Sequence, residues 1–141
     1  MDTSNDFNLV LEDFQIAEFF VVRPPHESTG NIHTGAYSYA QHGKEEDQIV
    51  YCMVVSFLDE EEANVGMFSP EFTFRIPDIG KLASTDNDNR LTLPKQLDEE
   101  LFRICYDTSR GMVFSLTNGT FLEGIILPVI SSFASENSLL T

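Results

Sequence analysis

The sequence predicts an α+β domain in which a four-stranded, Greek-key-like antiparallel sheet is followed by one long helix. Two observations indicate this fold. In the first half of the chain apolar residues alternate with polar ones, as in strands, whereas over residues 94–118 they recur every three or four positions, as in a helix. The 141 residues suffice for a single domain with its own core.

The first expected strand covers residues 7–22, where apolar side chains are dense and change phase partway along. A change of phase within a strand indicates a β-bulge, which shifts the inward face by one residue. A helix over residues 13–20 is the alternative, because several apolar positions there also fall on one helical face. Pro24 and Pro25 end the element in either case.

Three further strands are expected before residue 77. A weak strand covers residues 34–41, and the clearest one covers residues 48–58, with apolar side chains on both faces. Such a strand belongs at the centre of a sheet, covered on both sides. The fourth strand, over residues 64–76, has one apolar and one polar face. Its Pro70 marks an edge or a bulge, because proline cannot donate to the ladder.

A loop over residues 77–92 is expected to lead into the helix over residues 94–118. Pro94 suits the first turn of a helix, and Gly119 is a typical residue just beyond a helix end. Gly111 in the middle costs about 1 kcal/mol relative to alanine. It indicates either that another group packs closely there or that the cost is simply tolerated. An apolar segment, residues 121–130, and a short polar tail follow.

A sheet with a single helix has an uncovered surface, because one layer cannot cover both of its faces. The strand over residues 48–58, apolar on both faces, leads to the same conclusion. We therefore expect a second copy of the chain to close the free surface, so that the protein is a homo-oligomer.

The composition argues against several classes of partner. The chain has 8 basic and 23 acidic residues and a net charge of −15, so nucleic acids and anionic lipid surfaces repel it. No run approaches the ~18 apolar residues of a membrane helix. The first residues are polar and acidic, unlike a signal peptide. We expect a cytoplasmic protein without nucleic-acid partners and without membrane insertion.

The cysteines and histidines do not form a recognisable catalytic or metal motif. Cys52 and Cys105 lie in apolar stretches without zinc-ligand spacing, so we expect both to be small buried residues. His26, His33 and His42 lie outside any catalytic signature. We expect no enzyme, no cofactor and no metal. A hotdog-fold thioesterase, which also combines a long helix with an antiparallel sheet, is the enzymatic alternative.

Short motifs in the second half of the chain match those of one known family. They are Phe72-x-Phe74-x-Ile76, Leu101-Phe102, Arg110-Gly111, Asn118-Gly119-Thr120-Phe121 and Leu127-Pro128-Val129. Together with the order of four strands, long loop and long helix, they resemble the SecB family of protein-export chaperones. The short polar sequence after residue 130 differs from that pattern, because family members carry a second helix there that helps to cover the peptide groove.

The resemblance implies a chaperone that holds unfolded or nascent polypeptides in apolar grooves without nucleotide. It also implies a homotetramer built as a dimer of dimers, and transfer of preproteins to the SecA motor. Aromatic side chains suit such a groove, although core packing is the more common role. The residues expected to line it are Phe68, Phe72, Phe74, Phe121, Ile126 and Leu127.

Acidic residues could dock a basic partner, although a solvated surface is their more common role. The candidates are Asp13, Glu18, Glu60, Glu61 and Glu62. The shortened C-terminus favours a divergent branch of the family, such as a dedicated chaperone of one client, for example an antitoxin. A non-catalytic adaptor that binds one folded partner is a further alternative.

Overall fold

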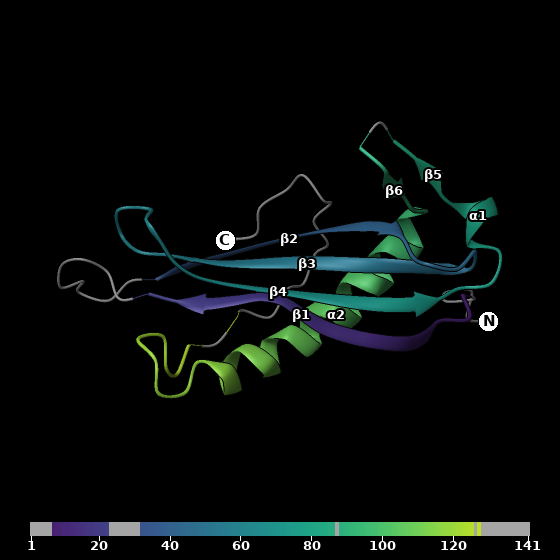
Figure 1. Cartoon of the computed structure of the whole chain (residues 1–141). Helices are drawn as coiled ribbons and strands as arrows, with labels where there is room; N and C mark the ends of the chain where they lie inside the picture. The colour runs from purple at the N-terminus through teal and green to yellow at the C-terminus, as the bar shows by residue number, and fades with distance from the viewer. Residues whose placement is uncertain (1–6, 23–31, 87, 126, 128–141) are drawn as a thin grey trace.

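In a computed structural model of the chain, six strands form one antiparallel sheet and a long helix lies on one of its faces (Figure 1). The structure describes residues 7–22, 32–86, 88–125 and 127. The elements in chain order are β1 (Val10–Val21), β2 (His33–His42), β3 (Gln48–Leu58), β4 (Asn64–Arg75), α1 (Ile79–Leu82), β5 (Ser84–Thr85), β6 (Arg90–Thr92) and α2 (Lys95–Leu116). The predicted α+β class is confirmed.

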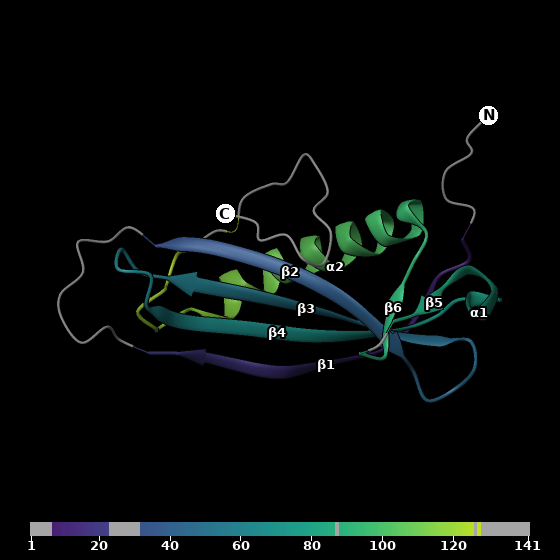
Figure 2. The same ribbon diagram turned by 90° about the horizontal axis from the view of Figure 1, so that it is seen from above.

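The strand order in the sheet is β1-β4-β3-β2-β6-β5. Strands β2, β3 and β4 are neighbours in succession, and β1 lies beside β4, which is a Greek-key arrangement. Figure 2, seen from above, shows the four long strands side by side with α2 along one side of them. The predicted central strand is β3, and it does lie between two long neighbours.

The prediction of four strands and of a loop over residues 77–92 is corrected by a small hairpin. This segment contains α1, β5 and β6, and β6 pairs with the end of β2. The Asp86 carboxylate accepts hydrogen bonds from the backbone N–H groups of Asp88 and Arg90, at 2.8 and 3.0 Å. The Arg90 guanidinium lies 4.1 Å from the centre of the Tyr39 ring. Polar contacts hold the turn of the hairpin, and the buried side chain of Leu91 packs β6 against the core.

β1 is a strand, so the helical alternative is wrong, and it carries two irregularities instead of the single bulge expected. Its register against β4 shifts between Leu11 and Asp13 and again between Ile16 and Glu18. Pro70 of β4 lies opposite Ile16, beside the second shift. It therefore marks a bulge in the neighbouring strand and does not lie at a sheet edge.

The first bulge of β1 directs the extra residue, Glu12, towards a cluster of polar side chains. The Glu12 carboxylate accepts hydrogen bonds from Arg75 Nε at 2.7 Å and from Gln48 Nε2 at 2.8 Å. Arg75 also forms an ion pair with Glu45. The hydrogen bond from Arg75, with a smaller contribution from Gln48, holds the pKa of the Glu12 carboxyl below its usual value. This cluster ties the edge strand to the turn between β2 and β3.

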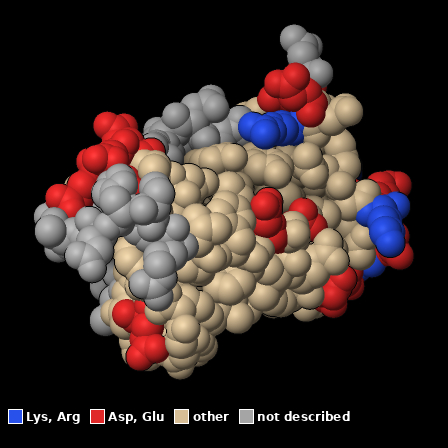
Figure 3. Space-filling model, turned by 60° about the vertical axis from the view of Figure 1, so that its left-hand side comes forward, with Lys and Arg blue, Asp and Glu red and all other residues tan. Residues whose placement is uncertain are grey.

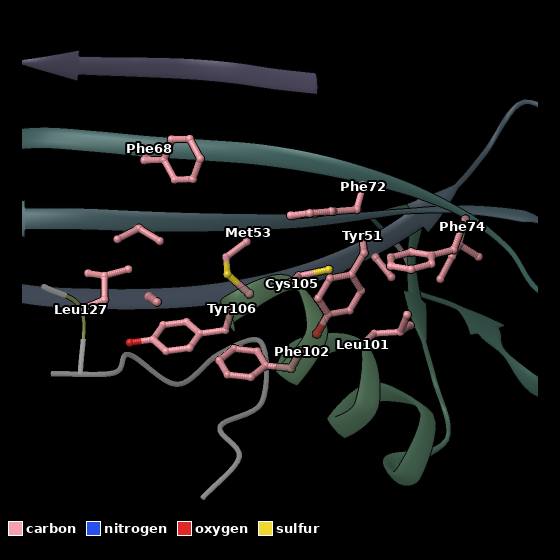
Figure 4. Packing of buried hydrophobic residues seen from close by; sticks show 14 of the residues in the cluster. Tyr51, Met53, Phe68, Phe72, Phe74, Leu101, Phe102, Cys105, Tyr106 and Leu127 are labelled. Carbon is pink, nitrogen blue, oxygen red and sulfur yellow. The ribbon is translucent and has the colours of Figure 1, made fainter. Parts of the chain in front are cut away.

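The hydrophobic core lies between α2 and one face of the sheet (Figure 4). Alternate residues of β3 project into it, and α2 contributes side chains at three- and four-residue spacing. The fully buried ones include Ile49, Tyr51, Met53, Val55 and Phe57 from β3 and Leu97, Leu101 and Cys105 from α2. The two periodicities seen in the sequence therefore meet in one core.

A buried hydrogen-bond network places the first turn of α2 over the sheet. The Tyr51 hydroxyl of β3 donates to a carboxylate oxygen of Asp98 on α2. The Ser38 hydroxyl lies 2.9 Å from the Tyr51 hydroxyl. Burial, with the nearby Asp98 charge as a further cause, raises the pKa of the Tyr51 phenol far above its usual range. The phenol therefore keeps its proton and remains a donor to the helix.

The opposite face of the sheet is not covered by α2. Here Cys52 and Val54 of β3 are nonetheless buried. In the ladder, Cys52 lies between Tyr39 of β2 and Glu71 of β4, whose longer side chains shield it. Cover on both sides of β3 is thus supplied by α2 on one face and by neighbouring side chains on the other.

Two glycine substitutions test how tightly the sheet is packed. A Cβ on Gly66 would lie 2.9 Å from Leu122 Cδ1 and 3.2 Å from the Phe20 carbonyl oxygen, whereas a Cβ on Gly111 would meet no described group outside its own helix backbone within 4 Å. We expect Gly66→Ala to lower the free energy of unfolding by about 1–3 kcal/mol. Gly111→Ala should raise it by about 1 kcal/mol. Urea denaturation measures both, and equal signs for the two would contradict this packing.

Candidate polypeptide-binding surfaces

The aromatic residues expected to line a groove on β4 lie in the core. Phe68, Phe72 and Phe74 are 0%, 1% and 2% exposed and project towards the face that α2 covers. Their rings pack against other aromatic rings, with centroid distances of 5.0 Å from Phe14 to Phe72 and 6.3 Å from Phe19 to Phe68. A groove open to solvent cannot be lined by side chains buried to this extent, so that prediction is corrected for these three.

The C-terminal candidates lie in a segment that folds back from the end of α2. Gly119 and Gly124 have φ values of +81° and +85°, a left-handed conformation that glycine adopts without strain. Phe121 is half-buried, Leu127 is buried in the core, and Ile126 lies outside the described residues. Arg110 Nε on α2 donates to the Leu127 carbonyl oxygen at 3.2 Å, so the segment runs back along the helix.

The acidic candidates are exposed and fall into two groups. Asp13 and Glu18 lie on β1, and Glu60, Glu61 and Glu62 lie in the turn between β3 and β4. Figure 3 shows a largely uncharged face on which acidic side chains lie in separate groups, some at the margins and some near the middle. The structure therefore does not gather the five acidic residues into one patch.

The β3–β4 turn that carries the acidic group is itself well ordered by hydrogen bonds. Asp59, the buried residue before it, accepts hydrogen bonds from the backbone N–H groups of Glu61 and Ala63, both at 2.9 Å. Glu62 adopts a left-handed backbone with φ of +66°. The three neighbouring glutamates are thus presented to solvent from a defined turn.

Exposed apolar side chains gather on β1, a feature that the sequence pattern did not identify as a site. Seven large apolar residues are exposed in the described part of the chain, and four of them lie on β1 or directly after it. These four are Val10, Leu11, Ile16 and Val22. β1 is also the edge of the sheet, so no described strand pairs with its outer side. Unpaired edge strands with apolar side chains readily pair with another chain.

The other exposed apolar residues are on the helices: Leu82 on α1 and Ile104 and Phe114 on α2. The outer side of α2 also carries Gly111, which no other group approaches. Of the two explanations weighed for this glycine, close packing therefore does not apply among the described residues. The outer side of α2 is a second uncovered surface with apolar side chains.

The cysteines are free and buried, as predicted. Burial raises the pKa of the Cys52 thiol to about 11 and that of Cys105 well above its usual value. His33 and His42 are exposed, with His42 Nε2 3.1 Å from Thr85 Oγ1, and His26 lies outside the described residues.

Within the described residues, no group of three or more His, Cys, Asp or Glu side chains is arranged to hold a metal ion. None of the described helices has the length and apolar character to cross a membrane.

Comparisons with known proteins found no match. A scan against protein-family models, a search of the curated proteins and a search of the solved structures each returned nothing similar to this chain. The resemblance to SecB therefore depends on the sequence motifs and the order of elements.

Truncation of one aromatic ring distinguishes a core from a groove. Phe72 is 1% exposed and Phe114 is 47% exposed, so Phe72→Ala and Phe114→Ala form a matched pair. We expect Phe72→Ala to lower the free energy of unfolding by about 3–5 kcal/mol. Phe114→Ala should change it by less than about 0.5 kcal/mol beyond its effect on helix propensity. Urea denaturation measures both changes in the free energy of unfolding. If Phe72→Ala left this free energy unchanged, the ring would not be in the core.

Proposed function

We propose that this protein is a SecB-like molecular chaperone that holds unfolded or nascent polypeptides in the cytoplasm without nucleotide and without catalysis. The observation that carries the proposal is the concentration of exposed apolar side chains on the unpaired strand β1 and on the outer side of α2. A chaperone that binds many sequences needs apolar surface and unpaired main-chain groups, because neither selects a particular sequence.

The resemblance to SecB supports the same function. It adds that the chaperone serves protein export and passes its clients to the SecA motor. A basic partner of this kind would be attracted by the net charge of −15 and by the glutamates of the β3–β4 turn. A dedicated chaperone for one client would use the same surfaces with a narrower choice of polypeptide.

The chain works as a homo-oligomer in this proposal, and β1 is the surface that joins two copies. Antiparallel pairing of two β1 strands around a two-fold axis would pair the outer edges of both sheets. It would also bring Leu11 and Ile16 of each copy into an interface. Registers that place Asp13 directly opposite Glu18 are disfavoured by charge repulsion. The outer side of α2 is then the exposed apolar surface that remains for client polypeptides.

The chaperone function is tested by refolding assays. We expect an excess of this protein to slow the refolding of several unrelated, chemically denatured proteins without added nucleotide, because their apolar segments remain bound. The native forms of the same proteins should not bind. Serum albumin at equal concentration is the control. Unchanged refolding rates for every client would exclude a general chaperone, and co-purification of one client from cells would then identify a dedicated one.

The dimer interface is tested by placing a charge on β1. Ile16 on β1 is 39% exposed and Leu82 on α1 is 41% exposed, so Ile16→Glu and Leu82→Glu add the same group at equal exposure. We expect Ile16→Glu to weaken self-association at least tenfold, since a buried unpaired charge costs several kcal/mol. Leu82→Glu should leave it unchanged. Sedimentation equilibrium measures both, and a wild-type protein that stays monomeric at micromolar concentration would refute the interface.

A further inference from the structure

The segment over residues 121–127 is attached to the rest of the chain at two points, and the first is a shape-specific anchor. Leu122 is buried, and its Cδ1 atom lies so close to β4 that a Cβ on Gly66 would be only 2.9 Å away. The absence of a side chain on Gly66 therefore makes room for Leu122. This contact is part of the hydrophobic core.

The second attachment point, at Leu127, is of a different kind. The Leu127 side chain is 1% exposed, and its carbonyl oxygen accepts a hydrogen bond from Arg110 Nε. Every residue has a backbone carbonyl, so the contact with Arg110 does not depend on sequence. Burial of the side chain selects only for size and apolar character. These two interactions are available to any extended polypeptide that carries a large apolar residue.

The surroundings of Leu127 fit a guest side chain. Tyr106, Arg110 and Val113 lie on one side of α2, four and three residues apart, and Phe102 stacks on Tyr106 with ring centroids 5.6 Å apart. Figure 4 shows Leu127 on the same side of the sheet as Phe102 and Tyr106. On the face of the sheet that α2 covers, β2 carries small buried residues. They are Ala36, Ser38 and Ala40.

We propose that the place filled by Leu127 is a binding site for one large apolar side chain of an extended client polypeptide, with Arg110 holding the client's backbone carbonyl. In the free protein the chain's own segment occupies this site and competes with the client. The inference rests on the proposed chaperone function. It reverses the role that the sequence suggested for Leu127, which fills the site instead of lining it.

The competition is effective because Leu127 is tethered five residues after the anchor at Leu122. A short tether keeps a ligand at an effective concentration in the millimolar range. A client must displace Leu127, so its apparent affinity is lowered by the fraction of time that the site is filled. Removal of the Leu127 side chain should therefore strengthen client binding.

The test compares Leu127→Ser with Leu127→Met in the full chain. Binding of reduced, alkylated α-lactalbumin, which stays unfolded, is followed by fluorescence anisotropy. We expect Leu127→Ser to bind it about tenfold more tightly than the wild type, since the internal competitor is lost. Leu127→Met should match the wild type, because methionine fills a similar volume. If the wild type binds α-lactalbumin, equal or weaker binding by Leu127→Ser would overturn the proposal.

A second measurement separates this site from the chaperone function as a whole. A fluorescein-labelled peptide with the sequence of residues 121–127 should bind Leu127→Ser and not the wild type. If neither protein binds α-lactalbumin but the peptide binds the variant, the chaperone proposal fails and the site stands. If the peptide does not bind the variant, the site is refuted. Circular dichroism checks folding, and Leu127→Ala replaces Leu127→Ser if the latter is unfolded.

Discussion

The burial of alternate side chains of β3 and β4 under α2 is the interaction on which the rest of this structure depends. The helix meets the sheet through Leu97, Leu101 and Cys105, and the Tyr51 hydroxyl ties its first turn to the strand beneath. Among the described residues, no strand pairs with the outer edge of β1, and α2 exposes apolar side chains on the side that faces away from the sheet. The surfaces proposed for subunits and clients are direct consequences of that two-layer arrangement.

β1 combines features that discourage pairing with features that favour it. Two bulges and the acidic residues Asp13 and Glu18 are devices that protect an edge strand from indiscriminate pairing. Leu11 and Ile16 on the same strand are nonetheless exposed. An edge with both properties accepts a partner only in a register that matches the bulges and separates the acids. Such selectivity suits a defined oligomer more than open-ended aggregation.

Periodicity predicted the elements that carry apolar side chains, and it failed where other forces decide. β3, β4 and α2 were predicted because burial imposes their repeats. The hairpin at Asp86 was missed because side chain to backbone hydrogen bonds form its turn and only Leu91 of its two short strands is buried, which is too little to give an apolar pattern. The alternation at Phe72 and Phe74 identifies one apolar face but not what covers it. A groove and a core require the same residues, so only the position of α2 separates the two.

In the proposed chaperone, an apolar site that is always open would bind other copies of the chain as readily as a client. A segment of the chain that fills the site removes this exposure while leaving the site available. Weak, isolated apolar contacts cannot displace a tethered leucine, whereas a long unfolded chain presents many apolar residues and gains from several contacts at once. Leu127 would thus be displaced by unfolded polypeptides, which make several apolar contacts at once, but not by folded proteins.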